Sequence, residues 1–379
     1  MVNSPYHETA KWLAKILEPI RQSLANHSLR DTFQFTDYLK NDDIRNRQMF
    51  SLDVVSLFTN VPLIETIEYI CQHIQECNIS IPIPLVKLKE LLLRCTFNVQ
   101  FLFNKTLYRQ HDGVAMGSPL GPLLADIFMT KLERGPLRCH IETLSHYYRY
   151  VDDIFCTAET DKDLDYLLEH FNSAHPAVKF TLEKESNDQL AFLDVLLSRR
   201  EDGTIRRAVY RKQTHSGQYI NFHSFVPMRD KRNLVKSLTY RAHKICSEDT
   251  LENELKNVRS MLQDNGYPER FLDKNMILPT EKLATPTVEK KLLYITLPYK
   301  GEAEAEMISQ KLKQAVNRTY NAASLRCLFS RTPLLKIQIK DKLPRQTNSM
   351  VVYSFRCTFE ASYIGRTARQ LSNRIRVWV

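Results

Sequence analysis

The sequence predicts an α+β fold, because helical and strand-like segments both occur and do not alternate strictly. Some segments repeat apolar residues at helical spacing; the first, residues 8–24, places Trp12, Leu13, Ile16, Leu17 and Ile20 on one side. Other segments are short apolar runs bounded by polar or turn residues, which is typical of strands. The chain exceeds one typical domain in length, so we expect two or three modules around a sizeable core.

The same patterns predict the remaining elements in chain order. Helices are expected at residues 62–75, 84–95, 120–132, 163–174, 231–263 and 302–321. Strands are expected at residues 49–57, 98–108 (a pair), 147–157 (a hairpin), 179–185 and 190–199. Residues 279–301 contain three prolines and are expected to form a connector.

The composition excludes several classes of protein. Hydrophobic residues make up 43% and charged residues 25%, which is ordinary for a globular chain, and 53 Lys and Arg against 43 Asp and Glu give a net charge of +10. No apolar run approaches the roughly 20 residues of a membrane span, and the charged N-terminal segment is unlike a signal peptide. The eight cysteines show no C-x-x-C spacing, which argues against a zinc site or a disulfide framework.

Positive charge is concentrated between Arg206 and Lys244, where ten Lys or Arg face one acid, Asp230, and aromatic residues are interleaved. Cations that neutralise phosphates, together with rings that stack on bases, are typical of a nucleic-acid surface. A solvated helical face with buried aromatics explains this segment equally well when it is taken alone. The candidate nucleic-acid-binding residues are Arg206, Arg207, Arg211, Lys212, Lys231, Arg232, Lys236 and Arg241.

Three acids occur at strand ends in apolar surroundings. Asp53 follows the apolar run of "SLDVVSLFTNVP", and Asp152 and Asp153 occupy the turn of the hairpin "YRYVDDIF". Adjacent carboxylates in such a setting repel one another and lose hydration, and a divalent cation offsets both costs. Mg²⁺ favours one or two carboxylates plus substrate phosphates, and two such ions can clamp an in-line displacement. We therefore expect two Mg²⁺ ions, which Mn²⁺ could replace.

These two segments and "DGVAMGSPLGPLLADIFM" at residues 112–129 resemble motifs A, C and B of a reverse transcriptase, in the order of that family. The resemblance implies that Asp53 and Asp152 bind the metal ions and that Asp153 is the adjacent, less directly liganding carboxylate. Phe58 matches the steric gate, a ring that excludes the 2′-hydroxyl of a ribonucleotide.

The resemblance also implies a nucleotide-binding loop formed by Met116, Gly117, Ser118 and Pro119, which would pack against the nascent base pair. Met116 stands where many reverse transcriptases have glutamine. Lys179 and Lys184 are both candidates for the motif D lysine that protonates pyrophosphate, and the sequence does not choose between them.

The closer resemblance is to Penelope-like elements, whose polymerases resemble telomerase reverse transcriptases. It rests on "SLDVVSLFTNVPL", "MGSPLGP", "FTLEKES", "LAFLDVLL", "VYRKQTHSGQYINFHS" and "NGYP". The implied fold is a right-hand polymerase palm, an antiparallel sheet plus helices, with incomplete fingers and a helical basic thumb. The expected divisions are 1–50, residual fingers and N-terminal helix; 51–200, palm with motifs A to D; 201–278, thumb; 279–345, connector; and 346–379, a truncated C-terminal segment.

The C-terminal segment resembles the start of a GIY-YIG endonuclease, a partial α/β unit. Tyr353, Tyr363 and Gly365 match its two name-giving strands, and Arg374 matches its catalytic arginine. Trp378 replaces the expected histidine, and the sequence stops before the metal-binding glutamate. We therefore expect a vestigial unit without nuclease activity.

The predicted function is RNA-directed DNA synthesis by a retroelement, with an RNA template, a DNA primer and dNTPs as partners and neither a membrane nor an identifiable protein partner. One alternative is an RNA-dependent RNA polymerase, against which Phe58 argues. The other is a catalytically inactive remnant that binds nucleic acid, since the basic motif that grips the triphosphate is missing before Asp53. The mechanism implies an intracellular, nuclear location, although the sequence carries no clear import signal.

Overall fold

A computed structural model of the chain describes residues 6–40, 44–97, 99–104, 106–277, 290–320, 322–330, 351–356 and 362–367. The chain divides into two compact units. The larger comprises Met1–Phe101 and Tyr108–Lys282, and the smaller Leu102–Leu107 and Leu283–Val379. Within the described residues, no helix is both long and apolar enough to cross a bilayer.

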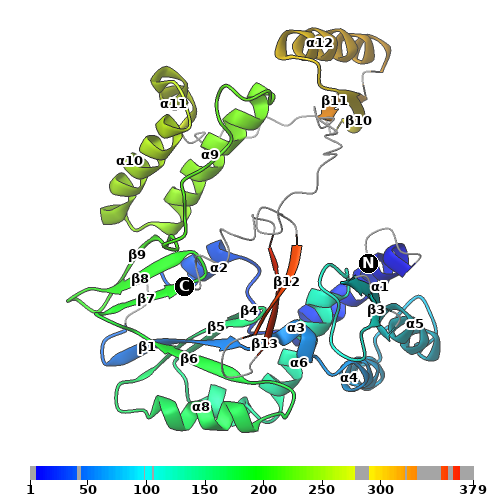
Figure 1. Cartoon of the computed structure of the whole chain (residues 1–379), viewed down its shortest axis with the longest axis vertical. Helices are drawn as coiled ribbons and strands as arrows, with labels where there is room; N and C mark the ends of the chain where they lie inside the picture. Colours follow the sequence, from blue (N-terminus) through cyan, green and yellow to red (C-terminus); the bar gives the residue numbers. More distant parts are fainter. Residues whose placement is uncertain are drawn as a thin grey trace. The chain divides into compact units, whose positions relative to one another are not determined.

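The larger unit is built on a four-stranded antiparallel sheet with strand order β4-β5-β1-β6 (Figure 1). Its strands are β1 (Arg47–Val54), β4 (His146–Tyr150), β5 (Asp153–Glu159) and β6 (Phe180–Lys184). The apolar run that contains Asp53 forms the central strand β1, and the hairpin predicted at 147–157 is confirmed as β4 and β5. The predicted α+β fold with an antiparallel sheet is thereby confirmed.

Helices and alternate strand residues form the main core on one face of this sheet. The helices are α1 (Tyr6–Leu24), α3 (Leu57–Asn60), α4 (Leu63–Glu76), α5 (Leu85–Phe97), α6 (Gly121–Arg134), α7 (Arg138–Ile141) and α8 (Leu164–Ser173). Phe50, Leu52 and Val54 of β1 enter this core together with Ile154 and Cys156 of β5. Side chains of a strand point alternately to its two faces, so this core fixes the orientation of every residue on β1 and β5.

A second core lies on the opposite face. It contains α2 (Thr32–Tyr38) and the three-stranded antiparallel sheet of β7 (Gln189–Phe192), β8 (Val195–Arg199) and β9 (Ile205–Val209). Met49 and Phe155 enter this core, and the ring of Phe35 lies 5.1 Å from that of Phe155. Asp53 is in phase with Met49, and Asp153 is in phase with Phe155. Both carboxylates therefore belong to this second face.

The sequence predicted one strand at 190–199, whereas the structure has the hairpin β7–β8 followed by β9, so this prediction was wrong. The chain reverses at Leu193, whose φ is +55°, and Asp194. Neither glycine nor proline marks this turn within the apolar run "LAFLDVLL", and period-2 patterns give no signal for a turn made by an aspartate after a leucine.

The basic segment that follows is helical, as predicted, but it is not continuous. It forms α9 (Met228–Ile245), α10 (Glu248–Asp264) and α11 (Glu269–Asn275), with a small core of their own. The helix predicted at 231–263 is interrupted at Cys246 and Ser247, which adopt extended backbone angles. The backbone N–H of Ser247 donates to the carbonyl of Arg207 at 3.0 Å, so a tertiary contact with β9 replaces a helical hydrogen bond.

The smaller unit contains a parallel pair, β10 (Lys291–Pro298) and β11 (Ala323–Ser330), joined by α12 (Glu302–Thr319). The helix predicted at 302–321 is confirmed, but the predicted connector at 279–301 is wrong for residues 291–298, which form β10. The same unit contains the antiparallel pair β12 (Val351–Arg356) and β13 (Ser362–Thr367). The strand pair expected at 98–108 is confirmed as β2 (Gln100–Phe103) and β3 (Thr106–Arg109).

Replacing a fully buried ring of the main core tests this architecture. Phe171 of α8 has no exposed surface, so Phe171→Ala should lower the free energy of unfolding by about 3–5 kcal/mol through lost burial and an unfilled cavity. Tyr166→Ala on the same helix removes a ring that is 60% exposed and should change it by about 0.5 kcal/mol or less. Urea unfolding of both variants measures the difference, and equal losses would contradict the placement of α8.

Candidate active site

The three predicted catalytic carboxylates converge at one end of the four-stranded sheet. Asp53 lies directly opposite Asp153 in the β1–β5 register, where Cβ atoms of paired residues are about 4.5–5.5 Å apart. The N–H of Val54 donates to the carbonyl of Asp152 at 3.0 Å. Asp152 lies in the β4–β5 turn, next to Val151, whose φ is +58°. The fold thus joins two segments that are distant in the sequence.

The carboxylates at this end of the sheet carry more negative charge than the nearby cations offset. Burial raises the pKa of Asp53, and the charge of Asp152 raises it further. Burial and the charges of Asp152 and Asp53 raise the pKa of Asp153 to about 6, although Lys212 acts in the opposite direction. Like charges directly opposite in a sheet destabilise it. A bound cation would relieve this repulsion.

The donor set matches a cation that completes its coordination with substrate. Carboxylate oxygens are hard ligands, and Mg²⁺ commonly takes one or two of them plus phosphate oxygens. In the part of the chain that the structure describes, no group of three or more His, Cys, Asp or Glu side chains is arranged to hold a metal ion alone. Among the described residues, the three aspartates are therefore not a complete metal site by themselves.

Phe58 lies on α3, immediately after the end of β1, and contacts the glycine-containing loop. The N–H of Val114 donates to the Phe58 carbonyl at 2.6 Å, and a Cβ placed on Gly121 would lie 3.6 Å from the ring. Gly113 has a φ of +73°, and a Cβ there would come within 2.4 Å of the Thr59 carbonyl oxygen. Only glycine allows these two segments to approach so closely. The half-buried ring is therefore held beside the loop of residues 112–121.

The predicted nucleotide-binding loop has an open part and a fixed part. Met116 is 79% exposed, and Gly117 has a φ of +84° with free space where a side chain would be. Ser118 is buried, and its hydroxyl accepts a hydrogen bond from the N–H of Leu120 at 3.3 Å. Pro119 is half-buried. Met116 and Gly117 are therefore the part of the loop that is open to a ligand, whereas Ser118 anchors the start of α6.

The two motif D candidates lie at opposite ends of β6. Lys179 precedes the strand beside the carboxylates, where its carbonyl accepts from the N–H of Val55 at 2.8 Å and its ammonium group donates to the carbonyl of Asn172 at 3.0 Å. Lys184 ends the strand, and its ammonium group contacts Asp165 at 2.8 Å. Position along β6 therefore favours Lys179.

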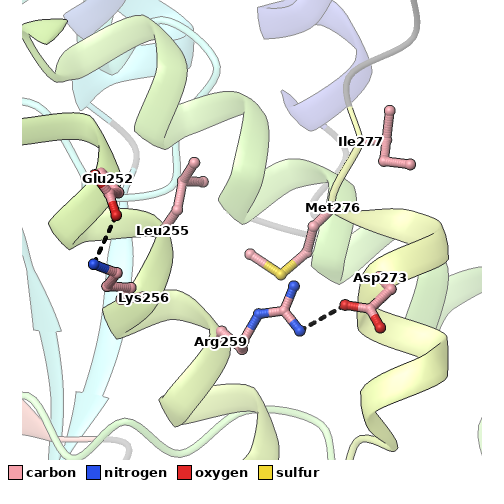
Figure 2. A pocket seen from close by; sticks show the side chains of 7 residues that line it. All are labelled: Glu252, Leu255, Lys256, Arg259, Asp273, Met276 and Ile277. Atoms are coloured by element: carbon pink, nitrogen blue, oxygen red, sulfur yellow. Dashed lines mark hydrogen bonds and ion pairs between the residues drawn. The ribbon is translucent and has the colours of Figure 1, made fainter.

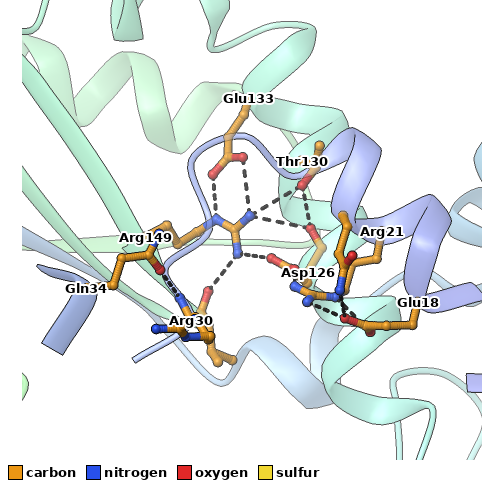
Figure 3. A network of polar contacts seen from close by, with 10 residues as sticks. Glu18, Arg21, Arg30, Gln34, Asp126, Thr130, Glu133 and Arg149 are labelled. Atoms are coloured by element: carbon orange, nitrogen blue, oxygen red, sulfur yellow. Dashed lines mark hydrogen bonds and ion pairs between the residues drawn. The ribbon is translucent and has the colours of Figure 1, made fainter. Parts of the chain in front are cut away.

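A buried ionic network lies directly behind the carboxylate turn (Figure 3). Arg149 of β4 is fully buried, and its guanidinium contacts Glu133 at 2.5 Å and Asp126 at 2.6 Å, both on α6. Burial would lower the pKa of Arg149, but the two carboxylates outweigh it and raise the pKa. The sequence interpretation missed this network. Its signal was an arginine in the apolar segment "HYYRYVDDIF", together with acids on the otherwise apolar helix α6.

The network continues to the N-terminal helix. Arg21 of α1 contacts Asp126 and Glu18, each at 2.6 Å. Burial alone would raise the pKa of Asp126, but the adjacent Arg149 and Arg21 lower it. One carboxylate therefore joins α1, α6 and β4, and the charges stay paired inside the fold.

The predicted nucleic-acid-binding residues fall into three groups. Lys212, Arg232 and Lys236 are exposed. Lys236 also borders a pocket of about 420 Å³ between α9 and α11, together with the exposed ring of Tyr240. Arg206, Arg211 and Arg241 form ion pairs with Asp249, Glu254 and Asp194, respectively. Lys212, Arg232 and Lys236 are therefore the predicted binding residues whose charges are most accessible to a phosphate.

Arg207 and Lys231 form the third group, which has an internal role. Both are buried; Arg207 donates to the carbonyl of Thr36 at 2.7 Å, and Lys231 donates to the carbonyl of Ser224 at 2.9 Å. Arg207 thus fixes helix α2 and Lys231 fixes the loop that precedes α9, and phosphates could reach their charged ends only if the fold opened. Sequence spacing could not show this, because a buried and an exposed lysine have the same pattern of neighbours.

A pocket of about 330 Å³ lies between α10 and α11 (Figure 2). Its lining residues are Glu252, Leu255, Lys256, Arg259, Asp273, Met276 and Ile277. Lys256 contacts Glu252, and Arg259 contacts Asp273, each at 2.7 Å. The charges of this pocket are thus matched by one another, and none of the predicted site residues lines it.

The residues of the C-terminal resemblance are partly described. Tyr353 of β12 lies opposite Gly365 of β13, and Tyr363 is on the same strand as Gly365. Arg374 lies outside the described residues.

The raised pKa of Asp153 predicts a specific dependence of stability on pH. The folded state holds this proton up to about pH 6, whereas an ordinary aspartate has a pKa of 3.8, so ionisation of Asp153 destabilises the fold. This cost is absent below about pH 4, grows as pH rises through the interval to about 6, and is then complete. Asp153→Asn should therefore raise the Tm at pH 7.5 in the presence of a chelator, and the gain should disappear near pH 4.

Thermal unfolding across this pH range, beside Asp161→Asn at an exposed site, measures the effect. A gain in Tm that is the same at both ends of the range would show that the Asp153 charge is not the cause.

Comparison with known proteins gives two family matches, one in each half of the chain. Residues 1–186 match the family described as "Reverse transcriptase (RNA-dependent DNA polymerase)", and residues 218–277 match the "Animal helix-turn-helix domain". No curated protein matches the chain.

Solved structures similar to the chain include polymerases of two kinds. Apo telomerase from Candida tropicalis, truncated from its C-terminal domain, is 15% identical (TM-score 0.41; 54% of this chain and 45% of that chain are covered). The Sicinivirus 3Dpol RNA-dependent RNA polymerase is 14% identical (TM-score 0.46; 69% and 58%). Telomerase from Candida albicans in complex with the TWJ fragment of telomeric RNA is 12% identical (TM-score 0.45; 67% and 46%).

The chain spans about half the length of these solved structures. The family match covers just under half of the chain and includes β1, the loop of residues 112–121, α6 and the β4–β5 hairpin. Residues 1–186, which include the four-stranded antiparallel sheet, are therefore similar in sequence to a reverse transcriptase domain.

Proposed function

We propose that this chain is the RNA-directed DNA polymerase of a Penelope-like retroelement, which extends a DNA primer 3′-hydroxyl on an RNA template. The observation that carries the proposal is the convergence of Asp53, Asp152 and Asp153 at one end of the palm sheet. The reverse transcriptase domain over residues 1–186 supports it. On this proposal the protein works in the nucleus, and β12–β13 is the vestige of a GIY-YIG unit.

The carboxylates have a defined part in this chemistry. Asp53 and Asp152 would hold two Mg²⁺ ions, which, when bound, stabilise charge on the attacking and leaving oxygens of nucleotidyl transfer. Without these ions Asp153 would be about half protonated near pH 6, because burial and the charges of its two neighbours raise its pKa to about 6. Phosphoryl transfer depends mainly on positioning and on charge stabilisation, so a site with few protein groups is sufficient.

The loop around Phe58 would select the nucleotide. The ring is fixed beside the loop of residues 112–121, and Met116 and Gly117 offer an open surface next to it. A ring in this place would collide with a 2′-hydroxyl, which favours dNTPs over rNTPs. This assignment argues against the RNA-dependent RNA polymerase alternative, since such an enzyme must admit that hydroxyl.

The exposed cations would bind the template and primer. Lys212 is close enough to Asp153 to affect its pKa, so it connects the carboxylate end of the palm with the basic segment. Arg232 and Lys236 are exposed on α9, one turn apart, where both can contact one phosphate backbone. The same surface supports a second candidate, a protein that binds nucleic acid without synthesising DNA.

Primer extension separates the two candidates. The purified chain should extend oligo(dT) on poly(rA) with Mg²⁺, and Asp152→Ala should abolish extension because a metal ligand is lost. The control is binding of the same primer–template, which Asp152→Ala should leave unchanged. Synthesis by neither protein, with equal binding by both, would establish the binding candidate.

Sugar selection provides an independent test of the Phe58 assignment. Phe58→Ala should raise rNTP incorporation relative to dNTP incorporation by about tenfold or more, because the steric barrier is removed. Tyr166→Ala, which removes an exposed ring on α8 outside the site, is the control and should keep the parent's preference. Unchanged dNTP preference in Phe58→Ala would remove the steric-gate assignment.

A further inference from the structure

Arg149 is held in place by hydrogen bonds to both its backbone and its side chain. Its N–H donates to the carbonyl of His27 at 2.9 Å, and its carbonyl accepts from the N–H of Leu29 at 2.6 Å. Its guanidinium is fixed by Glu133 and Asp126. Replacing buried ion pairs by neutral groups of similar volume is often neutral or stabilising, so such a network has to be explained by what it positions.

The feature that Arg149 contacts is the turn that carries the catalytic carboxylates. Its Nη1 atom donates to the carbonyl of Val151 at 3.4 Å, and Asp152 follows immediately. Val151 is β-branched and has a φ of +58°, a conformation that such residues rarely adopt and that surrounding structure has to impose. Arg149 is a fully buried side chain that reaches this turn.

The other side of the network belongs to α6, the helix that follows the nucleotide-binding loop. Asp126 and Glu133 lie on α6, which begins at Gly121 directly after that loop. The buried guanidinium of Arg149 therefore contacts both α6, through Asp126 and Glu133 (Figure 3), and the carboxylate turn, through Val151. A displacement of either part by 1 Å would be sufficient to reduce catalysis about 10²-fold.

We propose that Arg149 is a positioning residue of the active site, which sets the β4–β5 turn and the nucleotide-binding loop at a fixed separation through Val151, Asp126 and Glu133. This inference rests on the proposed function. Arg21 gives a matched control, because it contacts Asp126 from α1 but does not reach the turn.

The experiment compares the parent protein with a variant in which the buried network carries no charge. The triple variant Arg149→Met, Asp126→Asn, Glu133→Gln removes the buried charges together, and Arg21→Met removes only the outer contact. Mn²⁺ binding is measured by electron paramagnetic resonance, and kcat and KM for dNTP by primer extension. We expect the triple variant to fold, to bind Mn²⁺ about tenfold or more weakly, and to lose kcat more than KM. Arg21→Met should keep the Mn²⁺ affinity of the parent.

Parent-like Mn²⁺ binding in the folded triple variant would overturn the inference. If the triple variant does not fold, Arg149→Lys keeps the buried charge but loses the fork geometry, and it should show the same weakened Mn²⁺ binding. The proposed function is judged separately: a parent that binds Mn²⁺ through the aspartates but extends no primer would refute polymerase activity and leave the positioning role standing.

Discussion

The buried guanidinium of Arg149 is the constraint on which the geometry of the larger unit depends. A full positive charge is enclosed by β4, α6 and the chain that follows α1, and it is acceptable there only because Glu133 and Asp126 are placed around it. Asp126 is in turn shared with Arg21, so the N-terminal helix is tied to the same point. Helices that are distant in the sequence are therefore held at fixed positions relative to the carboxylate turn.

On the other face of the sheet, nearby cations do not fully neutralise the carboxylates of Asp53 and Asp153. The apolar alternation of β1 and β5 commits Phe50, Leu52 and Ile154 to the main core, and the period of two then places Asp53 and Asp153 together on the opposite face. Burial and the charge of Asp152 raise the pKa of both carboxyl groups, and the charge of Asp53 raises that of Asp153 further. The ionic network behind the turn and the open carboxylates in front of it are thus complementary parts of one site.

Much of this arrangement could be predicted from the sequence. Apolar runs and helical spacing predicted β1, α4, α6 and the β4–β5 hairpin to within a few residues, and the positions of the acids at strand ends predicted their convergence. The network of Arg149 was missed because a lone arginine in a strand does not reveal its partners, which lie on α6. Likewise, the burial of Arg207 and Lys231 depends on contacts with Thr36 and Ser224 that no local pattern encodes.

The secondary-structure elements that were predicted wrongly also depend on contacts that no local pattern encodes. The hairpin β7–β8 turns at Leu193 within an apolar run, and the break between α9 and α10 follows a hydrogen bond from Ser247 to Arg207. In both places tertiary contacts override local preference. Conversely, the loop at residues 112–121 was predictable, since Gly113 and Gly117 have positive φ and occur where the chain has to approach α3 closely or turn.

Metal-directed cleavage of the backbone tests whether Asp53 and Asp152 bind the divalent ions. Fe²⁺ replaces Mg²⁺ in the purified chain with primer–template and dNTP, and ascorbate with peroxide then generates radicals that cut the backbone beside the bound ion. If these two aspartates bind the ions, the fragments should end near residues 53 and 152. Excess Mg²⁺ should suppress this cleavage, and Asp152→Ala should abolish it. Cleavage at other places, or fragments unchanged by Asp152→Ala, would contradict this assignment.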